Sequence, residues 1–303
     1  PNLKTGRIAG ETSAALLPYG TQRGEAMAIR TDGAAMQGSV VLAAAGAAGS
    51  LLALVAAQGS ARLAAAAAIG LLAGVALYHA AFGFTGAWRR MLTDGRSAGA
   101  RAQLVLIGVA ALVTYPLFGW AETAGAALYG FVTPIGLPLA LGAFLFGIGM
   151  QLGGGCGSGT LFAAGGGSLR MLVTLAAFIA GSVVAVLHFP VWSAWPAMPG
   201  VSVIATLGWL PALALLVLAL VAGHLLLIRR ETARHGAAAP IGGFARPSGG
   251  RILRGPWTLL AGAFAIAGIS VATLLVTGAP WGITSAFALW GSKIAALAGA
   301  DPA

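Results

Sequence analysis

The chain of 303 residues is 58% apolar and only 8% charged, whereas an average soluble protein carries about 25% charged residues. So few charges cannot cover the surface of a soluble domain. Long uncharged runs recur, and in lipid such a run must satisfy its own backbone hydrogen bonds, which favours helices. The alternating, turn-punctuated segments of a membrane barrel are not seen. The composition therefore predicts an all-α integral membrane protein, a multi-span helical bundle.

The net charge of +10 would suggest a nucleic-acid partner in a soluble chain. Here the basic residues lie in short loops between apolar runs, where the positive-inside rule accounts for them. We therefore expect membrane lipid, and no nucleic acid, as a partner. A single cysteine, Cys156, excludes an internal disulfide and a multi-cysteine zinc site. The four histidines are scattered singly, and neither a metal nor a cofactor is expected.

Residues 1–38 are expected to form a polar N-terminal tail, and residues 39–303 the transmembrane domain. The tail lacks the basic, apolar and small-residue regions of a secretory signal peptide. It is either a disordered tail or upstream sequence read in frame, since Met27 and Met36 stand shortly before the first apolar run.

Apolar runs predict full-length spans and two irregular stretches. The full-length spans cover residues 39–57, 63–84, 104–120, 171–188, 202–228 and 258–278. The stretch 138–168 is interrupted by glycines at 153–159 and again at 165–167. The stretch 280–292 is too short to span, and is either a second re-entrant element facing the first or an interfacial loop.

The distribution of arginine predicts the orientation of the bundle. Arginines gather after the second span and after residue 228, at positions 89, 90, 96, 101, 229, 230, 234, 246, 251 and 254. The loops 121–137 and 189–201 contain no lysine or arginine, so they are expected outside the cell. The stretch 138–168 must then cross the membrane despite its glycines and emerge on the cytoplasmic side at Arg170.

The glycine-rich interruption is the candidate site. Non-helical backbone survives at membrane depth only inside protein or beside a water-filled cavity, and many transporters bind substrate where a helix is broken near mid-membrane. The sequence GGGCGSGT (153–160) places the only thiol at this break. Ser158 or Thr160 is expected to cap the following short helix, whose N–H groups would favour an anion.

Each feature also has a purely structural explanation. Small residues spaced by four often serve only close helix packing, and a lone cysteine in a span is usually a small hydrophobe. Gln151 could bind either substrate or the freed backbone. We assign as substrate-binding residues Cys156, Gly154, Gly155, Gly157, Ser158, Gly159, Thr160, Gln151, Trp281 and Thr284.

No set of nucleophile, base and orienting residue can be assembled from the sequence. The seven carboxylates all lie outside the predicted spans. We therefore expect a permease and not an enzyme.

Two segments and a third, weaker one resemble a known family. FLFGIGMQLGGGCGSGTLFAAGGGSLRM (144–171) resembles the signature of the YeeE/YedE family of sulfur-compound transporters. The segments at 79–104 and 280–293 resemble an earlier and a later part of that family. The resemblance implies an inverted-repeat transporter that imports thiosulfate or a related sulfur anion across the bacterial inner membrane. It also implies a thiol that contacts the substrate, a role only Cys156 can take, and a cytoplasmic TusA-like sulfur-carrier protein as partner.

Two departures from the family qualify these expectations. Members often read Phe-Cys-Phe-Thr where this chain reads Phe82-Gly83-Phe84-Thr85. A second Gly-Cys motif of the C-terminal repeat does not appear before Ala303, so we expect the sequence to be a fragment of a longer protein. Two alternatives stay open: a permease for selenium or another oxyanion, and a non-transporting membrane anchor for a sulfur-carrier protein.

Overall fold

The computed structural model describes residues 38–242, 256–297 and 299. The predicted tail at 1–38 lies outside the described residues except for Gly38, and so do the arginines at 246, 251 and 254. By its internal contacts the chain divides into two units, residues 1–42 and 43–303. All of the described helices lie in the second unit except the first five residues of α2 (Gly38–Ala57).

Nearly all of the described chain is helical. The helices are α2 (Gly38–Ala57), α3 (Ala61–Ala80), α4 (Phe84–Thr93), α5 (Ala98–Ala124), α6 (Leu137–Gly153), α7 (Gly157–Gly165), α8 (Leu169–Leu187), α9 (Phe189–Ser193), α10 (Val203–Leu207), α11 (Trp209–His235), α13 (Leu259–Thr277) and α14 (Ile283–Leu297). Two short strands, β1 (Ile135–Gly136) and β2 (Ala197–Met198), pair antiparallel.

Seven helical stretches of the described residues are long and apolar enough to cross a membrane. They comprise the six predicted full-length spans and the broken stretch, which runs from Leu137 to Gly165. This confirms an all-α, multi-span membrane protein. The last helix, α14, has 15 residues and is shorter than each of these seven stretches, as the sequence predicted for this region.

Three predicted spans differ from the observed helices. The span expected at 104–120 is the middle of a longer helix, α5, which covers residues 98–124. The span expected at 63–84 ends at Ala80, because Ala81 takes a left-handed conformation (φ 44°) and a separate helix, α4, follows. The span expected at 202–228 is divided at Gly208, whose φ of 81° suits glycine and interrupts a helix. The longer part, α11, then continues to His235, because its polar last turns are held by contacts described below.

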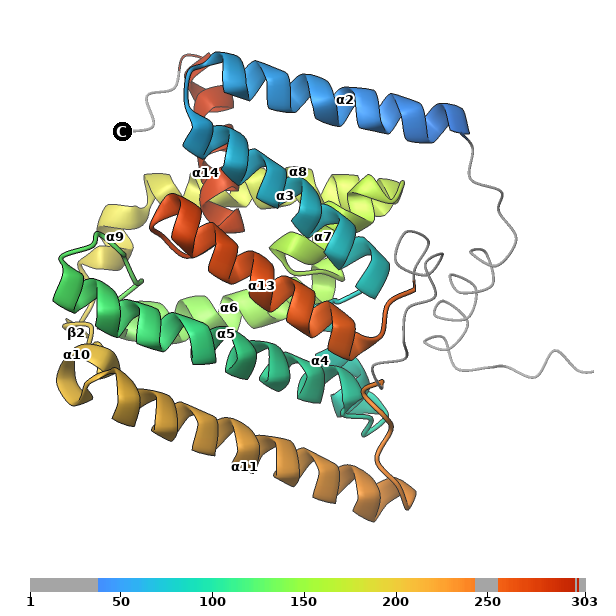
Figure 1. The fold of residues 1–303 in the computed structure, drawn as a ribbon, viewed down its shortest axis with the longest axis vertical. Coiled ribbons are helices and arrows are strands. Elements are labelled where there is room, and N and C mark those ends of the chain that lie inside the picture. Colours follow the sequence, from blue (N-terminus) through green and yellow to red (C-terminus); the bar gives the residue numbers. More distant parts are fainter. Residues whose placement is uncertain (1–37, 243–255, 298, 300–303) are drawn as a thin grey trace, which may run out of the picture. The chain divides into compact units, whose positions relative to one another are not determined.

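Small residues let the central helices pack closely, as is usual for helices in membranes. Helix α5 packs against both α11 and α13, and α13 also packs against α3 (Figure 1). A β-carbon at Gly262 of α13 would lie 2.5 Å from Cβ of Ala80. The buried core beside this contact is formed by Ala76, Leu77 and Ile266.

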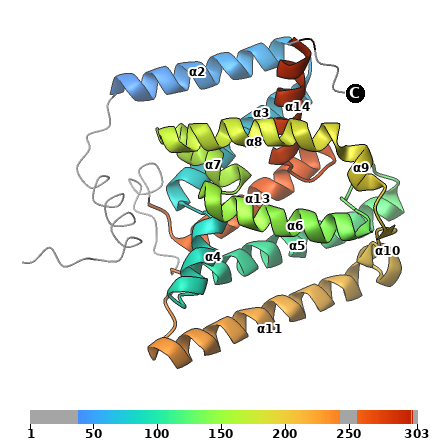
Figure 2. The ribbon, with the colours of Figure 1, turned by 180° about the vertical axis from the view of Figure 1, so that it is seen from behind.

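On the other side of the bundle, α8 packs against α7 and α14. Figures 1 and 2 show α14 running across the direction of α8 rather than along it. The helices approach closely where they cross, since a β-carbon at Gly291 would lie 2.2 Å from Val183 Cγ2. The rings of Phe178 and Phe287 meet in the same contact, with centroids 5.5 Å apart.

The β1–β2 pair joins the two loops that lack basic residues. Ile135 pairs with Met198 and Gly136 with Ala197. The loop residue Gly200 passes so close to Thr133 that a β-carbon would lie 2.6 Å from its carbonyl oxygen. The two loops, predicted to lie outside the cell, therefore form one connected end of the bundle.

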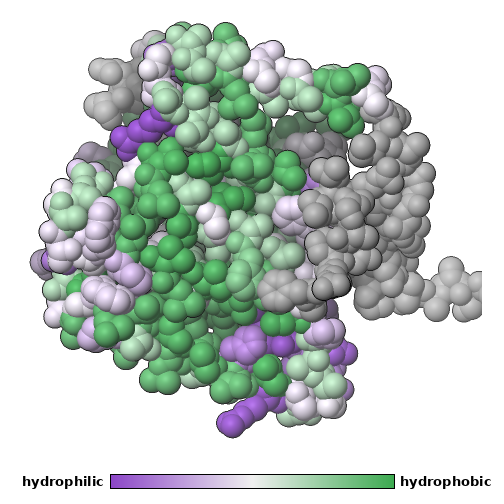
Figure 3. Space-filling view, viewed as in Figure 1, coloured by the Kyte–Doolittle hydropathy of each residue, from purple (hydrophilic) through white to green (hydrophobic). Residues whose placement is uncertain are grey.

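The opposite end holds a buried charge cluster around Glu231, whose side chain is fully buried near the end of α11. Its Oε2 accepts from Ser97 N at 3.1 Å and Ser97 Oγ at 2.5 Å, and from Arg101 Nη2 at 3.3 Å. Its Oε1 accepts from Ala239 N at 3.1 Å and lies 3.5 Å from Arg96 Nη1. One carboxylate thus ties the α4–α5 turn to the end of α11. In Figure 3 the visible face is mostly hydrophobic, with hydrophilic residues at the bottom, where α4 and α11 end, and again at the upper left.

Candidate functional site

The glycine break is a short, irregular connection between α6 and α7. Helix α6 ends at Gly153, and Gly154 follows with φ 77°, a left-handed conformation that favours glycine. Cys156 is the N-cap residue of α7, and its carbonyl accepts the first helical bond from Thr160 N at 2.8 Å. The predicted interruption at 153–159 is therefore a real break in the helix, but a shorter one of residues 154–156, because residues 157–159 already belong to α7.

The other glycines in and just after the break, at 155, 157 and 159, lie close to neighbouring residues, with little or no room for a side chain. A β-carbon at Gly155 would lie 3.0 Å from Thr160 Oγ1, and one at Gly159 would lie 3.4 Å from Cys156 Sγ. One at Gly157 would meet Ile283 and Phe287 of α14 at 3.5 Å. The start of α14 therefore lies against the start of α7, as expected if the two irregular stretches face each other.

Thiol and hydroxyl groups gather at the start of α7. The partly exposed Cys156 has its Sγ 3.4 Å from Ser158 Oγ. Thr160 is completely buried, and its Oγ1 has no hydrogen-bond partner in the described part of the chain. The expectation that Ser158 or Thr160 caps α7 is wrong, because both lie inside the helix and α7 has no side-chain cap. Its first N–H groups are consequently left for another acceptor.

Gln151 is engaged by an arginine that the sequence did not suggest. Arg89 of α4 donates from Nη2 to the Gln151 carbonyl at 2.9 Å and from Nε to Gln151 Oε1 at 3.4 Å. The residues are 62 positions apart, so only the packing of α4 against α6 brings them together. Gln151 therefore binds Arg89 beside the break.

A second arginine lies on the break itself. A β-carbon at Gly154 would be 2.9 Å from Arg170 Nη2 and 3.7 Å from its Cζ, so the guanidinium occupies the space that glycine leaves open. The sequence indicated Arg170 only as the point where the chain emerges on the cytoplasmic side. Its position one helix after the break, at the start of α8, is the signal that could have suggested this contact.

The break lies toward one end of the bundle. A β-carbon at Gly153 would lie 3.1 Å from Thr174 Cγ2. Thr174 is five residues beyond Leu169, where α8 begins, which is about 8 Å along a helix at 1.5 Å per residue. The sequence suggested mid-membrane depth, but relative to α8 the break is nearer the end that carries Arg170.

A cavity of about 880 Å³ adjoins the start of α7. It is lined by Ala44, Gly70, Ala73, Gly74, Val75, Leu77, Tyr78, His79, Ser158, Leu161, Phe162, Gly165, Gly166, Trp281, Gly282, Ile283, Ala286, Phe287 and Trp290. Ser158 thus lies between the Cys156 thiol and this largely apolar space. Of the two predicted residues near α14, Trp281 lines the cavity and packs on the core, whereas Thr284 is exposed and does not line it.

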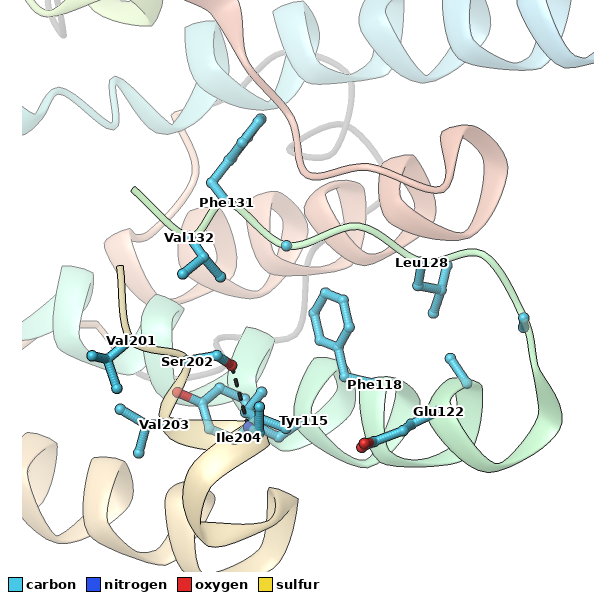
Figure 4. Close-up of a pocket in the computed structure, with 14 residues that line it drawn as sticks. Tyr115, Phe118, Glu122, Leu128, Phe131, Val132, Val201, Ser202, Val203 and Ile204 are labelled. Carbon is cyan, nitrogen blue, oxygen red and sulfur yellow. Dashed lines mark hydrogen bonds between the residues drawn. The ribbon is translucent and has the colours of Figure 1, made fainter. Parts of the chain in front are cut away.

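A second cavity, of about 510 Å³, lies at the opposite end, between the end of α5 and the loops that follow (Figure 4). Phe118, Leu128, Phe131 and Val132 surround it, and Ser202 Oγ is used to accept from Ala205 N. Its lining includes the carboxylate of Glu122 and no basic residue. Like charges repel, so this cavity is a poor place for an anion to bind.

The model of a protein family described as Sulphur transport matches residues 79–301. The matched region contains α4 to α14, and with them the glycine break and both arginines. None of the curated proteins matches the chain.

Proposed function

We propose that this chain, which belongs to the sulphur transport family, is an inner-membrane permease that imports a small sulfur-containing anion such as thiosulfate. Membership in the family supports sulfur transport by a multi-pass membrane protein, in agreement with the resemblance to YeeE/YedE proteins. The anion and its path are our proposal. Residues 39–303 would form the transport domain.

The observation that carries the proposal is the unpartnered hydroxyl of Thr160 beside the uncapped start of α7. A buried hydroxyl without a partner costs roughly 1–3 kcal/mol, so native proteins seldom keep one without a use. The N-terminus of a helix carries partial positive charge and free N–H groups. An anion at the break would accept hydrogen bonds from the Thr160 hydroxyl and from the N–H groups at the start of α7. It would thereby remove the free-energy cost of the unpartnered hydroxyl.

The Cys156 thiol extends this site toward the cavity. Its Sγ lies 3.4 Å from Ser158 Oγ, and Ser158 lines the cavity beside α7. A thiol is a weak donor with a polarizable sulfur, which suits transient contact with the sulfur of a thiosulfate ion. Cys156 and Ser158 would bind the anion transiently as it moves between the cavity and the break, without forming a covalent bond.

Two alternative functions are transport of selenium or another oxyanion and membrane anchoring of a sulfur-carrier protein. A selenium or other oxyanion would use the same N–H and hydroxyl groups. A membrane anchor for a sulfur-carrier protein needs no irregular backbone within a span, so the break supports transport over anchoring. A TusA-like carrier would receive the imported sulfur at the arginine-rich end, where Arg229 and Arg230 are exposed.

Uptake measurements on Cys156 variants test the proposal. In bacteria that lack their own thiosulfate uptake, the protein expressed from its complete coding sequence should accumulate radiolabelled thiosulfate. Cys156→Ser should keep normal insertion but lower uptake per inserted molecule severely, because serine replaces the soft donor with a more strongly hydrated one. Cys156→Ala should be at least as defective, because it removes the donor.

Ser182→Ala on α8 is the matched control, because Ser182 Oγ already donates to Phe178 O within its own helix. It should transport like the parent. If Cys156→Ala does so too, the thiol has no role in the pathway and serves only helix packing. Selenite and sulfate as competitors would identify an oxyanion cargo.

A further inference from the structure

At the arginine-rich end, where α4 and α11 end, some arginines form ion pairs with Glu231 and others form none. Within residues 38–242 and 256–297, the carboxylate of Glu231 makes ion pairs with Arg96 and Arg101. Arg89 and Arg170 form no ion pair in the same part of the chain. The buried cluster therefore neutralises the turn between α4 and α5, and the positive charges of Arg89 and Arg170 are among those at this end that it leaves uncompensated.

These two arginines flank the glycine break from different helices. Arg89 reaches from α4 to the carbonyl of Gln151, two residues before the end of α6. Arg170 reaches from the start of α8 to the face of Gly154. Both are exposed at the end of the bundle that the positive-inside rule places in the cytoplasm.

Gly154 permits the left-handed backbone conformation, and its lack of a side chain also leaves space for Arg170. Any β-carbon there would lie 2.9 Å from Arg170 Nη2, closer than atoms normally approach. The missing side chain therefore makes room for the guanidinium directly against the backbone of the break. An anion leaving the start of α7 past Gly155 and Gly154 would meet Arg170 first.

We propose that Arg170 and Arg89 form the cytoplasmic exit of the anion path, where their guanidinium groups bind the sulfur oxyanion as it leaves the glycine break. This inference rests on the proposed function and deepens it by assigning the charge selectivity of the same site. Guanidinium forms paired, charge-assisted hydrogen bonds with the oxygens of an oxyanion. Because both side chains are exposed, water competes for the anion, and it can be released as conduction requires.

A purely structural role makes a different prediction. Arg89 donates to a carbonyl near the C-terminus of α6, where basic side chains commonly stabilise a helix end. If stabilisation were its only role, replacing it would reduce the amount of inserted protein but not the transport by each molecule. The two roles are therefore separated by normalising uptake to inserted protein.

The experiment compares Arg170→Gln and Arg89→Gln with Arg90→Gln, all in the protein expressed from its complete coding sequence. Arg90 is the matched control, because it is exposed on the same helix as Arg89 and its side chain makes no described hydrogen bond or ion pair. Loss of one charge-assisted hydrogen bond should lower thiosulfate uptake per inserted molecule about tenfold for Arg170→Gln. Arg170→Lys keeps the charge and should recover part of the loss, and Arg90→Gln should behave like the parent.

The outcomes separate this inference from the proposed function. Thiosulfate uptake by the parent together with unchanged uptake by Arg170→Gln and Arg89→Gln would overturn the exit and leave the permease intact. An equal loss in Arg90→Gln would also overturn it, because the effect would then come from general positive charge. A parent that moves no thiosulfate would overturn the proposed function, and the exit with it.

Discussion

At Thr160 a hydroxyl group has no exposed surface and no partner in the described part of the chain. Threonine in a membrane helix commonly donates to the carbonyl four residues earlier, as Thr273 does to Ile269 at 2.8 Å. Thr160 makes no such bond, since Cys156 O accepts the backbone N–H of Thr160 but not its hydroxyl. The hydroxyl of Thr160 is therefore available to a ligand.

Thr160→Val tests this availability, because valine keeps the shape and removes the hydroxyl. If the hydroxyl binds the anion, uptake per inserted molecule should fall about tenfold or more, as expected for losing one hydrogen bond to a charged group. Thermal stability in detergent should be unchanged or higher, because an unsatisfied buried group has been removed.

Thr273→Val serves as the control for Thr160, since its hydroxyl is satisfied within α13. It should transport like the parent. A Thr160→Val protein with normal uptake would show that the hydroxyl is only a packing group.

At the scale of helices, the ends near the break are fixed by long-range polar contacts. The Glu231 carboxylate joins Ser97, Arg101 and Ala239, although Ser97 is 134 residues away in the sequence. Arg234 packs in the space left by Gly95, and His235 Nε2 contacts Asp94 O at 2.8 Å. These contacts hold the α4–α5 turn against α11. They therefore fix the C-terminal end of α4, the helix that carries Arg89.

Glu231→Gln should destabilise the protein. Arg101 is 4% exposed and would lose its counter-ion, and removing one partner of a buried ion pair typically costs about 3–5 kcal/mol. The measurement is the midpoint of thermal unfolding in detergent, which should fall clearly.

A double replacement of Glu231→Gln and Arg101→Gln should recover part of that stability, because neither charge then remains buried alone. Glu122→Gln, at an exposed residue of the opposite end, should have no effect. An unchanged midpoint for Glu231→Gln would mean that the cluster contributes nothing to the fold.

At the scale of the whole bundle, its two ends differ in charge and in construction. One end contains the β1–β2 pair and the loops without basic residues, together with the exposed Arg62, which donates to Val276 O and Thr277 O at the end of α13. The other end contains the Glu231 cluster and the other exposed arginines of the described residues. This polarity agrees with the positive-inside rule and sets the direction of the proposed path, with the arginine exit facing the cytoplasm.

Cysteine labelling in intact cells tests this orientation, in a Cys156→Ser background. A cysteine at Ser193, which is exposed beside the external loops, should react with an impermeant thiol reagent, and one at Ala233 near the end of α11 should be protected. Ser97 is unsuitable as a probe because it is buried against Glu231. Reaction at Ala233 with protection at Ser193 would reverse the orientation.

The sequence by itself determined the spans and the location of the break. Hydropathy over about twenty residues and runs of glycine are local properties, and in lipid every backbone group must be satisfied within its own helix. The bounds of α2, α8 and α13 therefore agree with the predictions within about two residues. The division at Gly208 was not predicted, because a single glycine inside an apolar run is often tolerated in a helix.

Only the tertiary structure decided which polar groups meet at the site. Arg89 reaches Gln151 because α4 packs on α6, and Arg170 reaches Gly154 because α8 starts beside the break. Trp281 lines the cavity from the turn before α14, whereas Thr284, in the first turn of α14, is exposed and does not line it. Such contacts depend on how helices distant in sequence pack together, and no local pattern of residues encodes that packing.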